Sequence, residues 1–297
     1  MDYYVLLTGG KNNAGDFLIK HRAKNLLKTI RDDRNFVDIN AWEPIEGEKL
    51  DLVNKSKGLL LTGGPALVSN IYNGTYRLNQ DLDNIKVPII SFGIGWNSEK
   101  GNWEDVNDYG FSSQSHHLLK RLSNNGFYNS VRDYHTYQVM KDNGVENVLM
   151  TGCPALYEQS YFGKGIELDD IGRINFSLGV SFAKSKKMET SVKELIISLC
   201  NQFGEDCIQV MFHHSIDPDY LKTPNPRVKL YNKNLEFANW LSENNITYKD
   251  ISGSADDLME EYNKADLHIG YRVHAHIFMS SISKPSILIS EDGRGKH

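Results

Sequence analysis

The sequence predicts an α/β protein made of two Rossmann-like domains, and three observations support this prediction. Short apolar runs alternate with longer amphipathic stretches along most of the chain, a pattern typical of parallel sheets covered by helices on both faces. Many apolar runs end in glycine, which suits the tight turns after parallel strands. The length of 297 residues fits two domains of ordinary size. The economical arrangement places them face to face across a cleft.

The first α/β domain is expected over residues 1–156. The apolar segment 3–8 has strand composition, and the periodicity that follows predicts a helix over 16–30. Later apolar runs stop at Gly-Gly-Pro, Gly-Ile-Gly and Gly-Cys-Pro, each of which marks the end of a strand. The other strands are expected at 36–41, 58–62, 87–92, 128–131 and 147–151, and the other helices at 113–124 and 134–143.

A stretch rich in glycine, charged and aromatic residues, 157–173, interrupts the alternation and is expected to link the domains. The alternation resumes in a second α/β domain over residues 174–297. Within it, Ser254 is a suitable N-cap, with Asp257 three residues later. The strands are expected at 174–182, 207–212, 246–248, 266–269 and 286–290, and the helices at 189–203, 232–244, 254–264 and 275–283.

Composition and charge narrow the class of protein. Forty per cent hydrophobic and 24% charged residues are typical of a soluble globular chain, and a formal charge of −5 disfavours a general nucleic-acid binder. Three cysteines without Cys-x-x-Cys spacing favour a reducing compartment. No apolar run approaches the ~18 residues of a membrane span. We therefore expect a cytoplasmic protein, and peripheral contact with the inner face of the membrane stays open.

The segment 266–285 contains the strongest candidate for a functional site. A short apolar strand ends at Gly270, and a helical pattern follows. Arg272 and His274 come directly after the strand, where open parallel sheets bind their ligands. A guanidinium binds anions in a forked geometry, and an imidazole can move a proton near neutral pH. The pair is therefore predicted to bind an anion and to transfer a proton.

Other polar residues follow other strand ends. Arg132 ends a strand, and both ligand binding and a structural ion pair are open for it. Asp133, next in the chain, is most simply an N-cap. Asn13 and Asp16 lie between the first strand and the first helix. Asp16 could cap that helix, or the two side chains could hold sugar hydroxyls.

Glycines at strand ends offer backbone N–H groups to a ligand, and Gly63 and Gly64 are candidates for this role. Each could equally serve only the turn. The chain contains neither a nucleotide P-loop nor a dinucleotide fingerprint, and it lacks the Gly-x-Ser-x-Gly elbow.

Histidines are the remaining candidates. His213 and His214 follow a strand, and because neighbouring strand residues point to opposite sides, we expect an imidazole in the site rather than a metal centre. His268, inside a strand, and His276 are expected to be structural.

Taken in order, these segments resemble the polysaccharide pyruvyl transferase family. The resemblance covers nearly the whole chain, and the ordered set is more specific than any one member. It comprises Asn-Ala-Gly-Asp at 13–16, Gly-Gly at 63–64, the strand into Gly-Ile-Gly at 88–95, Ser-Val-Arg-Asp at 130–133 with Thr136, Thr-Gly-Cys-Pro-Ala-Leu at 151–156, Gly-Tyr-Arg-Val-His-Ala at 270–275, Lys284-Pro285 and Glu-Asp-Gly-Arg at 291–294.

The resemblance implies a glycosyltransferase-B-type fold, with the acceptor on the first domain and the donor on the second. It implies transfer of the pyruvyl group of phosphoenolpyruvate, as a ketal, to sugar hydroxyls of a bacterial-type surface polysaccharide or its precursor, which could be lipid-linked. No cofactor and no metal are expected. The catalytic residues implied are His274, Arg272 and Arg132. The expected substrate-binding residues are Asn13, Asp16, Gly63, Gly64, His213, His214 and Arg294.

The chain departs from the family pattern at three positions. Cys153 stands where Asp is usual, Val273 replaces Leu, and Arg294 stands where we expect Lys. The chain also ends at His297, where relatives usually continue, so a truncated chain or a short subfamily is expected. Two other functions stay open: a glycosyltransferase with a nucleotide-activated sugar donor and, ranked last, a non-catalytic glycan-binding relative. The sequence predicts neither the acceptor sugar, its hydroxyls and the ketal stereochemistry nor the oligomeric state.

Overall fold

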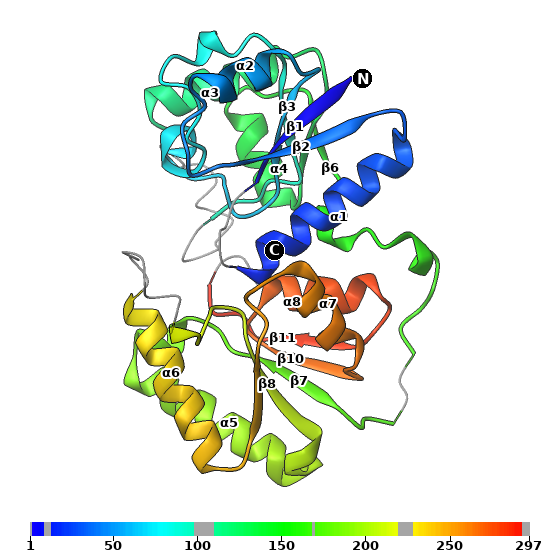
Figure 1. The fold of residues 1–297 in the computed structure, drawn as a ribbon, viewed down its shortest axis with the longest axis vertical. Coiled ribbons are helices and arrows are strands. Elements are labelled where there is room, and N and C mark those ends of the chain that lie inside the picture. The colour runs from blue at the N-terminus through cyan, green and yellow to red at the C-terminus, as the bar shows by residue number, and fades with distance from the viewer. Residues whose placement is uncertain (1, 9–12, 98–109, 168–169, 219–227, 293–297) are drawn as a thin grey trace. The chain divides into compact units, whose positions relative to one another are not determined.

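The computed structural model describes residues 2–8, 13–97, 110–167, 170–218 and 228–292 (Figure 1). These residues form two compact units, each with a parallel sheet and flanking helices. The first unit contains the chain up to Tyr157 except for residues 13–18, together with Asp292; the second contains residues 13–18 and 158–291. The start of the first helix and most of the expected linker therefore group with the second unit.

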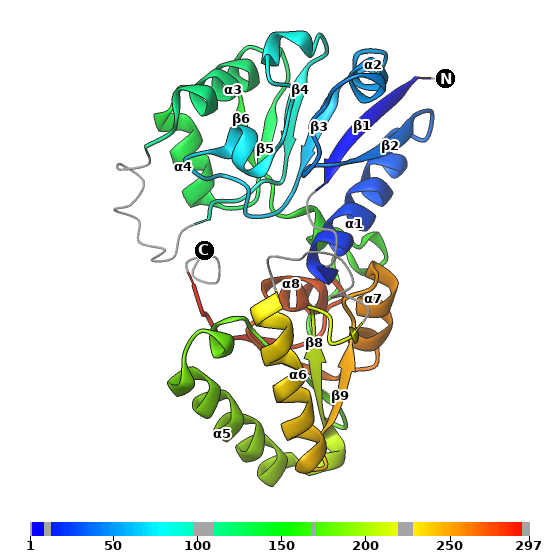
Figure 2. The same cartoon turned by 60° about the vertical axis from the view of Figure 1, so that its left-hand side comes forward.

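The first unit is a parallel sheet with the strand order β2-β1-β3-β4, next to which β5 and β6 form a parallel pair (Figure 2). Hydrogen bonds from the N–H of Gly93 to the carbonyl of Ser130 (2.9 Å) and from the N–H of Arg132 to the carbonyl of Ile94 (3.0 Å) join the pair to β4. The strands are β1 (Tyr3–Thr8), β2 (Asn35–Asn40), β3 (Leu59–Thr62), β4 (Ile89–Phe92), β5 (Asn129–Val131) and β6 (Val148–Met150). The helices are α1 (Ala14–Ile30), α2 (Glu48–Asn54), α3 (Ser113–Ser123) and α4 (Tyr134–Asp142).

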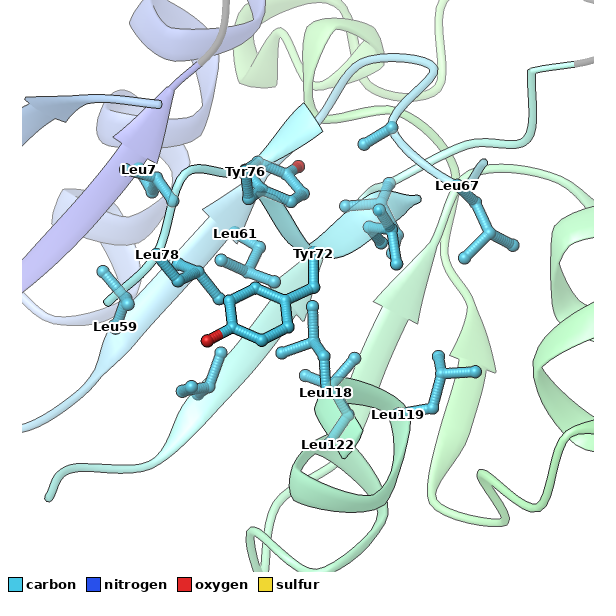
Figure 3. Packing of buried hydrophobic residues seen from close by; sticks show 14 of the residues in the cluster. Leu7, Leu59, Leu61, Leu67, Tyr72, Tyr76, Leu78, Leu118, Leu119 and Leu122 are labelled. Atoms are coloured by element: carbon cyan, nitrogen blue, oxygen red, sulfur yellow. The ribbon is translucent and has the colours of Figure 1, made fainter. Parts of the chain in front are cut away.

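The core of the first unit lies between β3 and the helices and turns that cover it (Figure 3). Leu59 and Leu61 of β3 are fully buried, as are Leu118 and Leu122 of α3. The ring of Tyr72 lies among these leucines. Burying one leucine side chain contributes roughly 1.5–3 kcal/mol, so this cluster is a main source of the unit's stability.

The second unit is a five-stranded parallel sheet with the strand order β11-β10-β7-β8-β9. The chain runs from β7 outward to β9 and then returns to the other side of β7 as β10. The carboxyl ends of β7 and β10 therefore form a topological switch point, the usual ligand position in such sheets. The strands are β7 (Ile174–Ser177), β8 (Ile208–Phe212), β9 (Thr247–Asp250), β10 (Leu267–Gly270) and β11 (Ser286–Leu288). The helices are α5 (Lys186–Phe203), α6 (Val228–Glu243), α7 (Ala255–Asn263) and α8 (Val273–Ser281).

The two faces of the second sheet differ in polarity. Ile174 and Phe176 of β7 pack into an apolar cluster with residues of α5 and α6. The alternate residues of a strand point to the opposite face, and here they are Asn175 and Ser177. The amide of Asn175 donates to a carbonyl of α7 (2.9 Å), that of Glu261. The face covered by α7 and α8 thus carries a buried polar network.

The structure confirms the expected fold class and most of the expected elements. Ser254 caps α7 by accepting from the N–H of Asp257 (3.0 Å), and Asp133 caps α4. The seven-residue helix α2 was not predicted; no side chain caps it. None of the described helices is long and apolar enough to cross a membrane.

The strand expected over residues 174–182 is shorter in the structure than predicted. It ends at Ser177, and residues from Ser181 to Ala183 form a 3₁₀ turn. The reason lies in the backbone N–H groups of Val180 and Ser181, which donate to the carboxylate of Glu291 instead of to a neighbouring strand.

Candidate functional site

Arg272 lies at the switch point of the second unit. Its Nε donates to the carbonyl of Leu178 (2.7 Å), and its Nη2 donates to the carbonyl of Gly179 (3.2 Å). Both carbonyls belong to the turn after β7, whereas Arg272 follows β10. The guanidinium therefore joins the two strand ends between which a ligand is expected. Carbonyl oxygens orient the guanidinium without cancelling its positive charge.

The backbone before Arg272 is fixed by close packing of β10 on β7. Gly270 has a φ of 148°, and a Cβ at this position would lie 2.4 Å from the carbonyl oxygen of Ser177. Only glycine, which has no Cβ, lets the backbones of β10 and β7 come this close. The Ser177 hydroxyl then accepts the backbone N–H of Arg272 (3.0 Å), which fixes the start of α8.

The two adjacent histidines after β8 have different environments. The Nε2 of His214 lies 3.5 Å from Nη1 of Arg272, and because arginine only donates, this nitrogen is the acceptor. The Nε2 of His213 instead lies 2.9 Å from the hydroxyl of Tyr262 in the interior. Burial, and then the charge of Arg272, hold the pKa of His213 well below its usual range, so this imidazole is neutral. The structure brings His214, and not His213, to Arg272.

His274 lies in the first turn of α8 and packs against the first turn of α1. A Cβ at Gly15 would lie 2.3 Å from Nδ1 of His274, so the imidazole occupies the space that any larger residue would fill. Asn13 is the N-cap of α1, and its Oδ1 accepts the N–H of Gly15 (3.3 Å). Asp16 accepts from the amide of Asn13 (3.2 Å) and orients it. Asn13 and Asp16 therefore lie at the helix start that contacts His274.

A chain of hydrogen bonds extends from Ser177, beside Arg272, into the interior of the second unit. The Ser177 hydroxyl that binds Arg272 also bonds Nε2 of His268 (2.8 Å). Nδ1 of His268 bonds the hydroxyl of Ser286 (2.7 Å), which in turn bonds Nδ1 of His276 (2.8 Å). Burial lowers the pKa of His268 to about 3 and also lowers the pKa of His276. Both imidazoles thus have structural hydrogen bonds, as expected from the sequence.

Arg132 belongs to the first unit, at the carboxyl end of β5. Its side chain is only 8% exposed, and Nε lies 3.5 Å from Oδ2 of Asp133. Asp133 also accepts the N–H of Thr136 (2.6 Å). A Cβ at Gly95 would lie 1.9 Å from Nε of Arg132, so this glycine makes room for the guanidinium. The structural ion pair is present, and a ligand-binding role for Arg132 stays a prediction.

Gly63 and Gly64 have structural reasons to be glycine. Their φ angles are 59° and 77°, in the left-handed region that L-residues rarely adopt. A Cβ at Gly63 would also lie 2.2 Å from Cγ2 of Ile19 in α1. Their expected substrate contacts stay predictions, and Arg294 lies outside the described residues.

Three residues of the site did not emerge from the sequence as functional candidates: Gly15, Ser177 and Glu291. A glycine inside a helical pattern is a signal that could have identified Gly15. Ser177 carries no such signal, and Glu291 is marked only by its place in the Glu-Asp-Gly-Arg segment of the family resemblance. Their roles depend on which strands become neighbours.

Comparisons with known proteins agree with this architecture. UDP-GlcNAc 2-epimerase from Methanocaldococcus jannaschii, solved with UDP-GlcNAc and UDP, is 11% identical, with a TM-score of 0.53 over 100% of this chain and 91% of that chain. S. aureus MnaA, solved with UDP, is also 11% identical, with a TM-score of 0.56 over 100% of this chain and 82% of that chain. At such low identity these likenesses establish the fold alone.

Among curated proteins no relative matches this chain. The family model described as polysaccharide pyruvyl transferase, in contrast, matches residues 13–293. The match begins at the N-cap of α1 and extends past Arg272, His274 and Glu291, so it includes the whole site of the second unit. This chain therefore belongs to the polysaccharide pyruvyl transferase family.

Proposed function

We propose that this transferase moves the pyruvyl group of phosphoenolpyruvate onto two hydroxyls of a saccharide acceptor, forming a cyclic ketal. The observation that carries the proposal is the placement of Arg272 at the switch point, with His274 in the next turn of the chain. The donor is small and carries a carboxylate and a phosphate. A guanidinium is the side chain best suited to bind such groups in a forked geometry.

The reaction needs protons to move in both directions. C3 of the donor gains a proton and becomes the methyl group, which leaves C2 electrophilic. One sugar hydroxyl attacks C2, the C2–O bond to phosphate breaks, and a second hydroxyl closes the ketal. Two hydroxyl protons are released, of which one balances the proton taken up by C3 and the other leaves with phosphate.

His274 is the residue we assign to this proton transfer. An imidazole can accept a proton from a sugar hydroxyl and donate one to C3, and a positioned acid–base group contributes ~10²–10⁴-fold to a rate. The ring packs directly against Gly15, which limits its movement toward the start of α1. A fixed ring is what proton transfer to a defined carbon requires.

Arg272 is assigned to the anion of the donor, with His214 beside it. The guanidinium would stabilise the charge that develops on the departing phosphate. Since Nε2 of His214 accepts from Arg272, a neutral His214 carries its proton on Nδ1.

The acceptor is assigned to the start of α1. The amide of Asn13 and the carboxylate of Asp16 are suited to sugar hydroxyls, and both lie in the helix turn that contacts His274. We extend the proposal to a surface polysaccharide or its precursor, lipid-linked or free, as the acceptor, and to the cytoplasm as the location.

A nucleotide-activated sugar is the alternative donor, and one observation favours it: two proteins with this fold were solved with UDP. In that case Arg272 would bind a diphosphate. The two donors differ in chemistry, so one experiment separates them.

The test is a thermal-shift and calorimetry panel with phosphoenolpyruvate, UDP and UDP-GlcNAc, run on the wild type and on Arg272→Lys. The proposal expects stabilisation of the wild type by phosphoenolpyruvate alone, and at least a tenfold weaker affinity in Arg272→Lys, because an ammonium lacks the fork. Stabilisation by UDP or UDP-GlcNAc, with none by phosphoenolpyruvate, would replace the proposed donor.

A further inference from the structure

We propose that Glu291 is a positioning residue for Arg272 and acts through the turn that follows β7. The inference rests on the proposed function, because it assumes that Arg272 binds the donor. Glu291 follows β11 and has no place in the mechanism described above. Its contacts nevertheless connect it to the guanidinium through four consecutive residues, 178–181.

The turn is bound from two sides by groups of opposite charge. Oε2 of Glu291 accepts the N–H groups of Val180 and Ser181, both at 3.0 Å. Leu178 and Gly179, the two residues before them, present their carbonyls to Arg272 at 2.7 and 3.2 Å. The Glu291 carboxylate thus fixes the last two residues of the turn, and the carbonyls of the first two residues orient the guanidinium of Arg272.

Close packing makes this connection stiff. A Cβ at Gly179 would lie 2.4 Å from Oε2 of Glu291 and 2.9 Å from Cβ of Tyr271, the residue before Arg272. The backbone at Gly179 is therefore enclosed between Glu291 and the chain that leads into Arg272. Movement of either neighbour is therefore expected to shift Gly179, whose carbonyl accepts from Arg272.

Because a single oxygen of Glu291 accepts both N–H groups, the proposal predicts a graded series of variants. Glu291→Gln keeps a carbonyl oxygen that can accept the same two bonds, although hydrogen bonds to a charged acceptor are stronger. Glu291→Ala removes the acceptor of both N–H groups, and the turn is free to shift. A misplacement of about 1 Å at a reacting group can lower a rate ~10²-fold.

The experiment measures acceptor-dependent phosphate release from phosphoenolpyruvate by the full chain. We expect Glu291→Ala to lower kcat/KM for the donor at least ~10-fold, and Glu291→Gln to recover most of the loss. Glu194→Ala, which removes an exposed glutamate on α5, is the matched control and should behave as the wild type. Melting temperatures of all variants show whether the fold is intact.

A double-mutant cycle with Arg272→Ala decides whether Glu291 acts through Arg272. If Glu291 acts only by positioning Arg272, Glu291→Ala should have little further effect on kcat/KM in the Arg272→Ala background. Additive losses, or wild-type kinetics in a folded Glu291→Ala variant, would overturn the inference while leaving the proposed function intact. If the wild type releases no phosphate with any acceptor, the proposed function fails and the inference fails with it.

Discussion

Replacing Gly15 with alanine tests the contact between α1 and His274. The new Cβ would lie 2.3 Å from Nδ1, 2.8 Å from Cγ and 3.0 Å from Cβ of His274. The close atoms extend down to the base of the side chain, so a rotation of the ring alone does not relieve the overlap. The imidazole has to move away from the start of the helix.

The size of the effect follows from these distances. Ordinary contact begins near 3.4 Å, so Nδ1 must move by about 1 Å, and a shift of that size at a catalytic group costs ~10²-fold in rate. The overlap costs about 1–3 kcal/mol of stability, and the preference of a helix for alanine over glycine, roughly 0.5–1 kcal/mol, offsets part of that cost. A large loss of turnover in a protein that is still folded is therefore the expected signature.

The assay compares kcat at saturating phosphoenolpyruvate and acceptor, together with the melting temperature. Gly165→Ala is the matched control, because its Cβ meets no atom within 4 Å and its φ is not in the left-handed region. We expect the control to keep wild-type kcat. A folded Gly15→Ala protein with wild-type turnover would refute the assignment of His274 to proton transfer at this position.

Three further predictions concern single groups. Arg272→Lys should lower kcat/KM for phosphoenolpyruvate at least tenfold in a protein that remains folded, as steady-state kinetics and a melting curve will show. For His268 the folded pKa of about 3 lies below the ordinary value of 6.5, so the unfolded chain binds the extra proton and stability is lost as the pH falls below 6.5. Between pH 7 and pH 5 this group lowers the free energy of unfolding of the wild type by about 2 kcal/mol. In urea unfolding, the decrease between the same two pH values should be smaller by about that amount in His268→Gln. Burial opposes ionisation of Glu261, but hydrogen bonds from Lys249, Lys264 and Arg173 lower its pKa to about 2. The ionised Glu261 carboxylate contributes to the free energy of unfolding above pH 4.5, and this contribution is lost as the pH falls toward 2. In urea unfolding, Glu261→Gln should therefore be less stable than the wild type at pH 7, and the difference should shrink in acid.

Much of the fold could be predicted because it follows from local pattern. Apolar runs that end in glycine gave the strands, and side chains such as Asp133 and Ser254 gave helix starts that the structure confirms. The position of Arg272 was also predictable, since it requires only that a parallel strand ends at Gly270. The separation of His213 from His214 followed from strand alternation.

The remaining features depend on packing between segments distant in sequence. Gly15 and His274 are 259 positions apart, and no local pattern pairs them. Glu291 binds the turn after β7 only because β10 and β11 pair beside β7 in the strand order. The end of β7 at Ser177 was missed for the same reason, since the acceptor of the next N–H groups is a distant side chain.

The central claim is that His274 transfers the proton that turns the donor into a ketal, and NMR of the product in D₂O tests it most directly. Wild-type enzyme with phosphoenolpyruvate and acceptor should give a ketal whose methyl group carries one deuterium, because C3 takes its third hydrogen from solvent-exchangeable groups. His274→Gln should still bind phosphoenolpyruvate and should form no such methyl group. Formation of the deuterated ketal by His274→Gln at a rate near that of the wild type would contradict the account.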